Sequence, residues 1–290
     1  MYKKLLLLCL SVCFVSADIH AQSNLFRYYN NYRNASSKAK KLYQRDYLGY
    51  GICAMSIDVK QHYTDIRYTD PANTTTVYSS PPADTFIHTK YASSSSSWNY
   101  TEGTFFPLAK TGREGLFAID FSTSVNITQY NIGKIDYSSA TGIVETGVTE
   151  TFNFPIALVY KSGGEVNLNK KSKFMFTIGC GIAPYLSASK IITFGDATFG
   201  ARQFAMVEMG YFAGLAWKVR AVVYSGNMTL VDKPNADIFN ATSGHSDGIG
   251  NLDIKVIGNG GASLTLLVNP FSWDWKGTGD NYSWENKGKL

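Results

Sequence analysis

The sequence contains few of the residues that most enzymes and metal sites depend on. The chain of 290 residues has four cysteines and four histidines, and charged side chains make up only 17% of it. Cys9 and Cys13 lie in an apolar N-terminal run, which leaves Cys53 and Cys180, too few for a disulfide framework. Both lie on the apolar side of an alternating segment, so we interpret them as small hydrophobic strand residues, with a disulfide as the alternative.

Histidine is equally sparse, and its spacing indicates no catalytic or metal site. His62, His88 and His245 each fall in or beside a predicted loop, and none has metal-ligand spacing to a cysteine or to another histidine. The chain also has no G-x-S-x-G motif and no phosphate-binding P-loop. We therefore expect no catalytic residues, no metal and no cofactor.

Long hydrophobic runs are missing as well. After the N-terminal run, no window offers the roughly 20 consecutive apolar residues that a transmembrane helix needs. A transmembrane barrel is not excluded, because each of its strands needs only about 9 to 11 residues of alternating pattern. The formal net charge of +5 is too small to indicate a nucleic-acid partner.

The N-terminus predicts export. Lys3 and Lys4 precede an apolar run from Leu5 to Val15, and Ala21 closes a small-residue cleavage site. The interpretation divides the chain into four parts. These are a signal peptide over 1–21, a loosely ordered N-terminal periplasmic leader over 22–47 with a short helix from Ser36 to Tyr47, a β-barrel over 48–269 and a C-terminal tail over 270–290.

The sequence is rich in aromatic residues, and in several stretches bulky apolar side chains alternate with small or polar ones. Tyrosine, phenylalanine and tryptophan make up 14% of the chain, as is typical of a β-rich protein. The clearest alternation runs from Thr151 to Leu186, where bulky side chains share one parity and small ones the other. This stretch predicts a hairpin whose two strands are joined by a polar turn over 162–172.

Six further strands can be placed in the same way. The predicted strands cover 48–62, 98–108, 115–128, 151–160, 174–186, 202–213, 217–224 and 252–268. Their linkers alternate between long and short: 63–97, 109–114, 129–145, 162–172, 187–200, 214–216 and 226–250. Short turns at one rim and long loops at the other are typical of an up-and-down barrel in an outer membrane. The predicted fold is thus an all-β, antiparallel up-and-down transmembrane β-barrel of about eight strands, with short periplasmic turns and long extracellular loops.

In such a barrel the bulky parity faces lipid and the small, polar parity faces the lumen. The residues expected to face lipid are Phe117, Ile119, Phe121, Phe152, Phe154, Ile156, Leu158, Phe174, Phe176 and Ile178. The residues expected to form a polar network in the lumen are Asp58, Lys60, Asp120, Glu208, Arg220, Asp253 and Lys255. Eight strands leave room for side chains but not for an open channel.

With its signal peptide, its amphipathic strands and the glycine-rich runs FTIGCGIAPYL and PIALVYKSGGEV, the chain resembles the small outer-membrane β-barrel families of Gram-negative bacteria. The resemblance covers about Leu48 to Val268 and is one of pattern, without a diagnostic motif. Barrels of this kind often end on a C-terminal aromatic residue, whereas this chain continues past Val268, and Phe271 is the candidate for that role.

These observations favour a non-enzymatic protein of the cell outer membrane with a structural, adhesive or complex-forming role and no open pore. Its expected partners are outer-membrane lipid and, at the long loops, an envelope protein or extracellular ligand. One alternative is a secreted soluble β-sandwich that binds carbohydrate or protein through the loop aromatics Tyr91, Trp98 and Tyr100. The other is a rim-active outer-membrane hydrolase built around His88 with Asp84, or His245 with Asp247.

Overall fold

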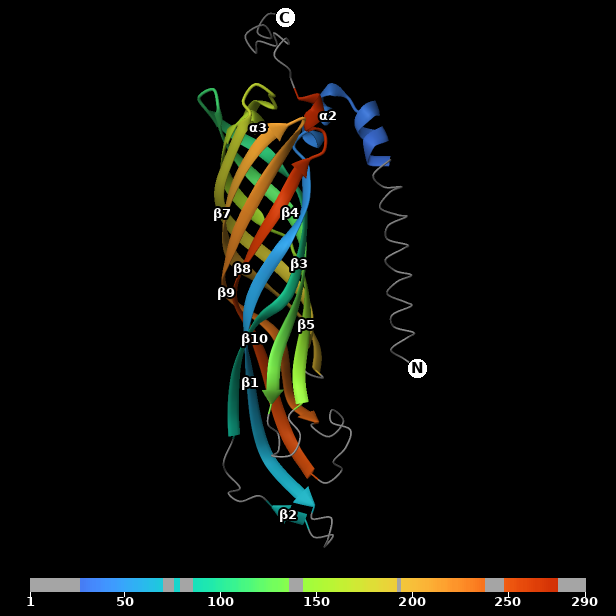
Figure 1. Cartoon of the computed structure of the whole chain (residues 1–290), viewed down its shortest axis with the longest axis vertical. Helices are drawn as coiled ribbons and strands as arrows, with labels where there is room; N and C mark the ends of the chain where they lie inside the picture. The colour runs from blue at the N-terminus through green and yellow to red at the C-terminus, as the bar shows by residue number, and fades with distance from the viewer. Residues whose placement is uncertain are drawn as a thin grey trace, which may run out of the picture.

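The fold is a closed ring of antiparallel strands that follow one another around the ring in sequence order (Figure 1). The computed structural model describes residues 27–69, 76–78, 86–135, 143–191, 194–237 and 248–275. No helix among these residues is long and apolar enough to cross a membrane. The strands are β1 (Tyr47–Thr69), β2 (Thr76–Tyr78), β3 (Phe86–Thr111), β4 (Gly115–Ile135), β5 (Ile143–Asn153), β6 (Ile156–Gly163), β7 (Phe174–Ile191), β8 (Phe194–Ala213), β9 (Leu215–Asp237) and β10 (Gly248–Asn269).

The ring closes between the first strand and the last. β1 pairs with β10 from Leu48 opposite Val268 to Tyr68 opposite Gly248, and with β3 on its other side. This closure rules out the predicted alternative of a two-sheet sandwich, and it places Tyr91, Trp98 and Tyr100 on β3 instead of in a loop.

β5 and β6 follow one another along a single strand position, interrupted at Phe154 and Pro155. β6 pairs with the first part of β4 and β7, whereas β5 pairs with the later part of β4 and β7. The proline carbonyl still accepts a hydrogen bond from the backbone N–H of Ser122 at 3.0 Å, so the wall stays continuous. Without the short β2, the described strands fill eight positions around the ring, which agrees with the prediction.

The predicted long loops are largely strand, and this corrects the sequence interpretation. β1 and β3 extend to Thr69 and from Phe86, across much of the expected loop 63–97. The expected loops 129–145, 187–200 and 226–250 shrink in the same way to the gaps after β4, β7 and β9. Polar and serine-rich segments form strands here because their backbone groups pair with long neighbouring strands on both sides.

The two ends of the barrel differ. The end that we call the capped end carries the short connections after β3, β6 and β8, the N-terminal helical segment and the residues that follow β10 (Figure 1). The connection after β6 contains α3 (Gly164–Asn167), and η1 (Ser272–Asp274) follows β10. The opposite end, reached by the extensions of the strands, is called the far end.

The described residues of the N-terminal leader are folded and pack at the capped end of the barrel, and together with the segment after β10 we call them the cap. Residues 27–34 are helical, and α2 (Ser37–Tyr43) begins after Ser36, whose hydroxyl accepts a hydrogen bond from the backbone N–H of Ala39. The Tyr32 ring stacks on Phe271 with a centroid distance of 4.1 Å. The predicted short helix is present, but the expectation of a loosely ordered leader is wrong for residues 27–46.

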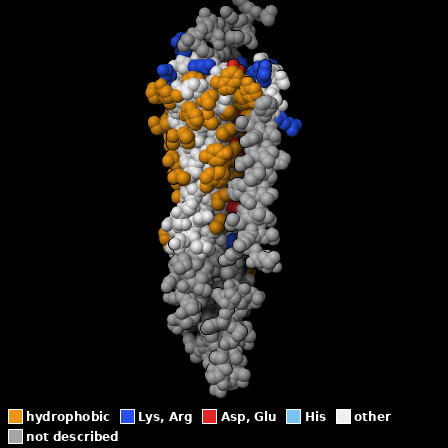
Figure 2. Space-filling model, turned by 45° about the vertical axis from the view of Figure 1, so that its right-hand side comes forward, with side chains coloured by type: hydrophobic (Ala, Val, Ile, Leu, Met, Phe, Trp, Pro, Cys, Tyr) orange, Lys and Arg blue, Asp and Glu red, His pale blue; other side chains and the backbone are white. Residues whose placement is uncertain are grey.

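The outer surface changes character along the barrel. Over the half nearer the capped end it is apolar (Figure 2), and we call this band the apolar belt. Its exposed members include Ile52, Phe106, Phe117, Phe121, Phe152, Phe154, Ile156, Leu158, Phe174, Phe176, Ile178, Ile182, Leu186, Val207, Met209, Trp217, Val219, Val223, Leu264 and Leu266. Beyond the belt, in what we call the far half, the outward side chains include Asp58, Lys60, Glu150, Lys190, Asp232 and Lys255.

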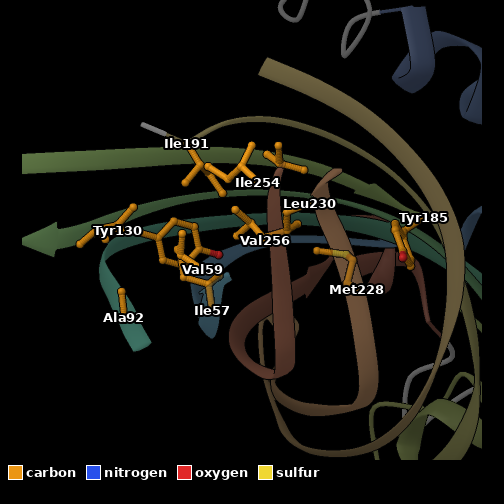
Figure 3. Close-up of a cluster of buried hydrophobic side chains, with 12 residues drawn as sticks. Ile57, Val59, Ala92, Tyr130, Tyr185, Ile191, Met228, Leu230, Ile254 and Val256 are labelled. Atoms are coloured by element: carbon orange, nitrogen blue, oxygen red, sulfur yellow. The ribbon is translucent and has the colours of Figure 1, made fainter. Parts of the chain in front are cut away.

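The interior contains apolar side chains in both halves, and in the belt half these include Phe105, Leu116, Phe204 and Met206, which are buried in the same half as several charged groups. In the far half it is filled by a cluster of apolar side chains from facing strands, which point toward one another inside the curved sheet (Figure 3). Ile57, Val59, Leu230 and Ile254 are each at most 1% exposed. The far half therefore has the apolar core and charged surface of a water-soluble protein, whereas the belt half has an apolar exterior.

The closing seam between β1 and β10 gives a test of this architecture. A Cβ at Gly51 would lie 2.0 Å from the backbone oxygen of Leu264 across the seam, an overlap that no side-chain rotation relieves. We expect Gly51→Ala to cost about 1–3 kcal/mol, or roughly 2–12 °C in the unfolding temperature measured in detergent. Ala262→Val, which adds volume on the outer face of β10, is the control and should unfold like the parent; equal stability of Gly51→Ala would contradict the seam.

Candidate functional site

Inside the belt half, near the capped end, six charged side chains are buried together. The three cations are Lys161 on β6 and Lys218 and Arg220 on β9, and the three anions are Asp120 on β4, Glu165 on α3 and Glu208 on β8. Their side chains are at most 4% exposed. We call this group the ionic cluster.

Glu208 lies at the centre of the cluster. Its carboxylate accepts a hydrogen bond from the Nε of Arg220 at 2.5 Å, and its other oxygen is 3.5 Å from the amines of both Lys161 and Lys218. Glu165 bridges the same two lysines, with its oxygens 3.1 Å from Lys161 and 2.8 Å from Lys218. Each carboxylate therefore contacts more than one cation, which offsets much of the cost of burying the charges.

Asp120 and two aromatic rings complete the arrangement. Arg220 lies 3.5 Å from Asp120, which also accepts a hydrogen bond from the Tyr47 hydroxyl at 2.5 Å. The Tyr47 ring lies 4.7 Å from the Lys218 amine and 4.4 Å from the Arg220 guanidinium, and the Phe105 ring lies 4.4 Å from the Lys161 amine. Rings at these distances stabilise cations where water is excluded.

Backbone geometry brings Glu165 into the interior. The chain leaves β6 at Gly163 with φ 94°, a conformation that side-chain-bearing residues rarely adopt, and α3 follows at once. A Cβ at Gly164 would lie 2.3 Å from the carbonyl oxygen of Ser172, so the turn folds tightly onto itself. Leu168 then ends the turn with φ 50° and packs near Met175 and Trp275. The short turn thus closes the capped end of the lumen.

A fourth buried cation, Arg202, lies farther along the lumen. Arg202 donates to the side-chain oxygen of Asn153 at 3.0 Å, and its guanidinium lies 3.9 Å from the centre of the Tyr224 ring. No carboxylate among the described residues forms an ion pair with it. Buried amides and hydroxyls, including Asn99, which accepts from Thr265 at 2.7 Å, line this middle part.

The structure brings together only part of the polar network expected from sequence. Asp120, Glu208 and Arg220 meet in the ionic cluster. Lys255 is half-exposed and pairs with Asp232 on the outside at 3.2 Å, while Asp58, Lys60 and Asp253 alternate with the inward-facing Ile57, Val59, Ile254 and Val256. The assignment of Asp58, Lys60, Asp253 and Lys255 to the lumen is thus corrected, because the inward face of β1 and β10 is apolar in the far half.

The outward-facing set lies where the alternation places it. Phe117, Phe121, Phe152, Phe154, Ile156, Leu158, Phe174, Phe176 and Ile178 are 39% to 74% exposed on the outer surface, and Ile119 is partly exposed on the same face of β4. Cys180 lies on this face as a free thiol, whereas Cys53 is a buried free thiol, so the two do not form a disulfide.

The lumen set expected from sequence omitted Tyr47, Lys161, Glu165 and Lys218, of which Lys218 shares the inward parity of Arg220 on β9. Lys161 shares the parity of Ala157 and Val159 and could have been assigned to the lumen from the alternation of β6. Tyr47 and Glu165 lie outside the predicted strands, and no periodicity identifies them. The suggested hydrolase residues Asp84, His245 and Asp247, and the side chain of His88, lie outside the described residues; among those described, no cluster of three metal-ligating residues occurs.

The balance of charge in the ionic cluster can be tested by neutralising one side. Glu165→Gln leaves three cations facing two carboxylates, and we expect a loss of about 3–5 kcal/mol in the free energy of unfolding. Glu165→Gln combined with Lys218→Met restores equal numbers and should recover part of that loss in thermal unfolding. Lys255→Met, which removes an exposed pair, should change stability by less than about 1 kcal/mol. If the losses in unfolding free energy of the two single variants simply add in the double variant, the coupling between Glu165 and Lys218 is contradicted.

Comparison with known proteins gives little beyond the architecture. No family model matches the chain, and no curated protein matches it in sequence. Among solved structures, the outer membrane protease OmpT from Escherichia coli is similar at 12% identity, covering 76% of this chain and 96% of that one with a TM-score of 0.32. A FadL homologue from Pseudomonas aeruginosa is similar at 8% identity, covering 78% and 90% of the two chains with a TM-score of 0.19. At such scores neither likeness bears on what this chain does.

Proposed function

We propose that the chain is a non-enzymatic β-barrel protein of the Gram-negative outer membrane, with no open pore and a structural, adhesive or complex-forming role. The observation that carries the proposal is the change of the outer surface along the strands, from apolar in the belt to charged in the far half. Apolar side chains point outward in the belt and inward in the far half. Water around the whole barrel would leave the belt unfavourably exposed, whereas lipid around the belt and water around the far half satisfy both surfaces.

The height of the belt supports this placement. On β4 the outward apolar residues run from Phe117 to Ile127, ten residues apart. At about 3.4 Å per residue and a strand tilt of about 40°, this distance corresponds to roughly 26 Å along the barrel axis. An outer-membrane barrel has an apolar band of about 25 Å.

The capped edge of the belt has the composition of a membrane interface. The aromatic pairs Phe117–Tyr160 and Phe174–Tyr211 each have centroid distances of 5.3 Å near this edge. Exposed basic residues, including Arg113, Lys171 and Lys173, lie just beyond it on the short turns, and Figure 2 shows lysine and arginine gathered there above the apolar surface. Aromatic rings suit the headgroup level and basic side chains suit lipid phosphates. We assign this edge to the periplasmic side, where short turns belong.

The far half then extends outside the cell as a rigid, water-exposed barrel. Its apolar core and the antiparallel pairing of long strands support a surface that alternates charge, such as Lys233 with Asp196 at 3.1 Å and Lys255 with Asp232. A stable platform of this kind suits contact with an envelope protein or an extracellular ligand. Transport through the lumen is not part of the proposal, because the ionic cluster and the apolar cluster fill it at two levels.

The native cysteines provide a test of the lipid-facing belt. Cys180 faces outward in the belt between Ile178 and Ile182, whereas Cys53 is buried. In membrane-embedded protein we expect Cys180 to react with a lipid-soluble maleimide and to resist a charged one. Cys180→Ser removes the signal, and Lys60→Cys in the far half should react with the charged reagent. Rapid reaction of Cys180 with the charged reagent, or extraction of the native protein without detergent, would refute a lipid-facing belt.

A lumen closed by side chains predicts that the barrel conducts no ions. Purified barrel inserted in planar bilayers should show no steady conductance above background, because the lumen is filled by side chains from facing strands. Folding of the barrel in the same preparation is verified by heat-modifiable gel migration. Stable, voltage-independent conductance steps from the inserted parent protein would contradict the proposal of a closed lumen.

A further inference from the structure

A groove of about 820 Å³ lies on the outer wall of the barrel and reaches the capped end. Its apolar wall is formed by exposed belt residues, among them Tyr50, Phe121, Phe154 and Ile156. Tyr28 of the N-terminal segment and Pro270, just after β10, contribute to its lining. The groove lies where the β1–β3 ladder begins, with Tyr47 opposite Gly103, while β3 continues to Thr111.

Glu102 places a carboxylate in this otherwise apolar groove. It is exposed on the outer face of β3 and accepts hydrogen bonds from the hydroxyl of Tyr100 at 2.9 Å and from that of Thr123 at 3.4 Å. No basic side chain of the described residues forms an ion pair with it. A charged side chain on a lipid-facing surface is unfavourable unless a counter-group reaches it.

A second carboxylate belongs to the same groove. Asp46 lines it and accepts a hydrogen bond from Tyr28. Burial raises the pKa of the Asp46 carboxyl and the nearby charge of Glu102 raises it further, while the hydroxyls of Tyr28 and Thr104 lower it. The two acidic groups are thus close enough to influence each other, and the groove has a negative end next to an apolar wall.

Aromatic residues, namely Tyr50 and Tyr100, line the groove together with the exposed carboxylate. The rings of Tyr50 and Tyr100 have a centroid distance of 5.0 Å, and Trp98 lies 5.8 Å from Tyr50. Electron-rich rings beside a carboxylate are the surroundings that an organic cation prefers, because each ring attracts positive charge with its face. Carboxylate, rings and apolar wall together select a ligand that is cationic at one end and apolar at the other.

We propose that this groove binds an ethanolamine phospholipid, with its primary ammonium at Glu102 and an acyl chain along Phe121, Phe154 and Ile156. The proposal rests on the lipid-facing belt proposed above. A primary ammonium donates hydrogen bonds that a carboxylate accepts, whereas the quaternary ammonium of a choline lipid donates none. An anionic glycerol phospholipid has no cation to offer the two carboxylates.

The test measures lipid retention on the full-length mature barrel in detergent micelles by native mass spectrometry. Phosphatidylethanolamine, phosphatidylcholine and phosphatidylglycerol of identical acyl chains are offered at equal concentration. We expect the parent to bind the ethanolamine lipid about tenfold more tightly than the other two, the factor expected for one charge-assisted hydrogen bond. Equal binding of all three lipids overturns the proposal.

Two variants locate the site. Glu102→Gln should reduce the ethanolamine preference to near unity while heat-modifiable migration confirms a folded barrel. Glu150→Gln, which neutralises an exposed carboxylate just beyond the belt on β5, is the matched control and should keep the preference. A preference that survives Glu102→Gln, or that disappears equally in Glu150→Gln, overturns the assignment to this groove.

Further outcomes distinguish failure of the lipid site from failure of the lipid-facing belt on which it rests. A lysine-containing peptide that binds the groove in place of any phospholipid would assign it to a partner protein and overturn the lipid. Charged maleimide reacting freely with Cys180 would refute the lipid-facing belt itself, whereas protected Cys180 without ethanolamine preference would leave the belt intact and refute the groove alone.

Discussion

The hydrogen bonding of β1 to β10 is the constraint on which the rest of the molecule depends. Once these strands pair, the sheet has no edges around the ring, and eight strand positions enclose a space too narrow for anything but side chains. Every inward residue must then find its partner inside that space. Six charged residues meet in equal numbers around Glu208, Arg202 contacts Asn153 and the Tyr224 ring, and apolar residues pack in clusters in both halves.

The same strands serve two surroundings because their outer face changes from apolar to charged partway along. β1 illustrates the change: Tyr50 and Ile52 face outward near the capped end, whereas Asp58 and Lys60 face outward farther along. Pairing of the backbone continues through the change, apart from a register shift between Ala54 and Ser56. The ladder thus supplies stability that is independent of the medium, and the side chains adapt each half to its own surroundings.

The sequence was sufficient to predict the positions of the strands. It was not sufficient to predict where the strands end or, in the far half, which side chains face the lumen. Alternation located all eight positions, because period two survives in both halves of the barrel. It could not place Asp58 or Lys255, since the rule that relates parity to the lumen reverses where the core becomes apolar. The strands were predicted too short because serine-rich segments have a weak propensity for strand formation. In the structure such segments form strands by pairing with their neighbours, as where Ser96 and Ser97 pair with β4. Glu165 depends on the turn at Gly163, which alternation does not describe.

The stack of Tyr32 on Phe271 joins the segment before β1 to the segment after β10, and Tyr32 also donates a hydrogen bond to Asp274, 242 residues away in sequence. Contacts of such long sequence separation form late in folding, since all intervening strands must first be in place. The cap is therefore an indicator of completed assembly: a barrel whose last strand has not found its first has no surface on which the leader can dock. Protection of the leader from proteolysis would then distinguish finished barrels from open sheets.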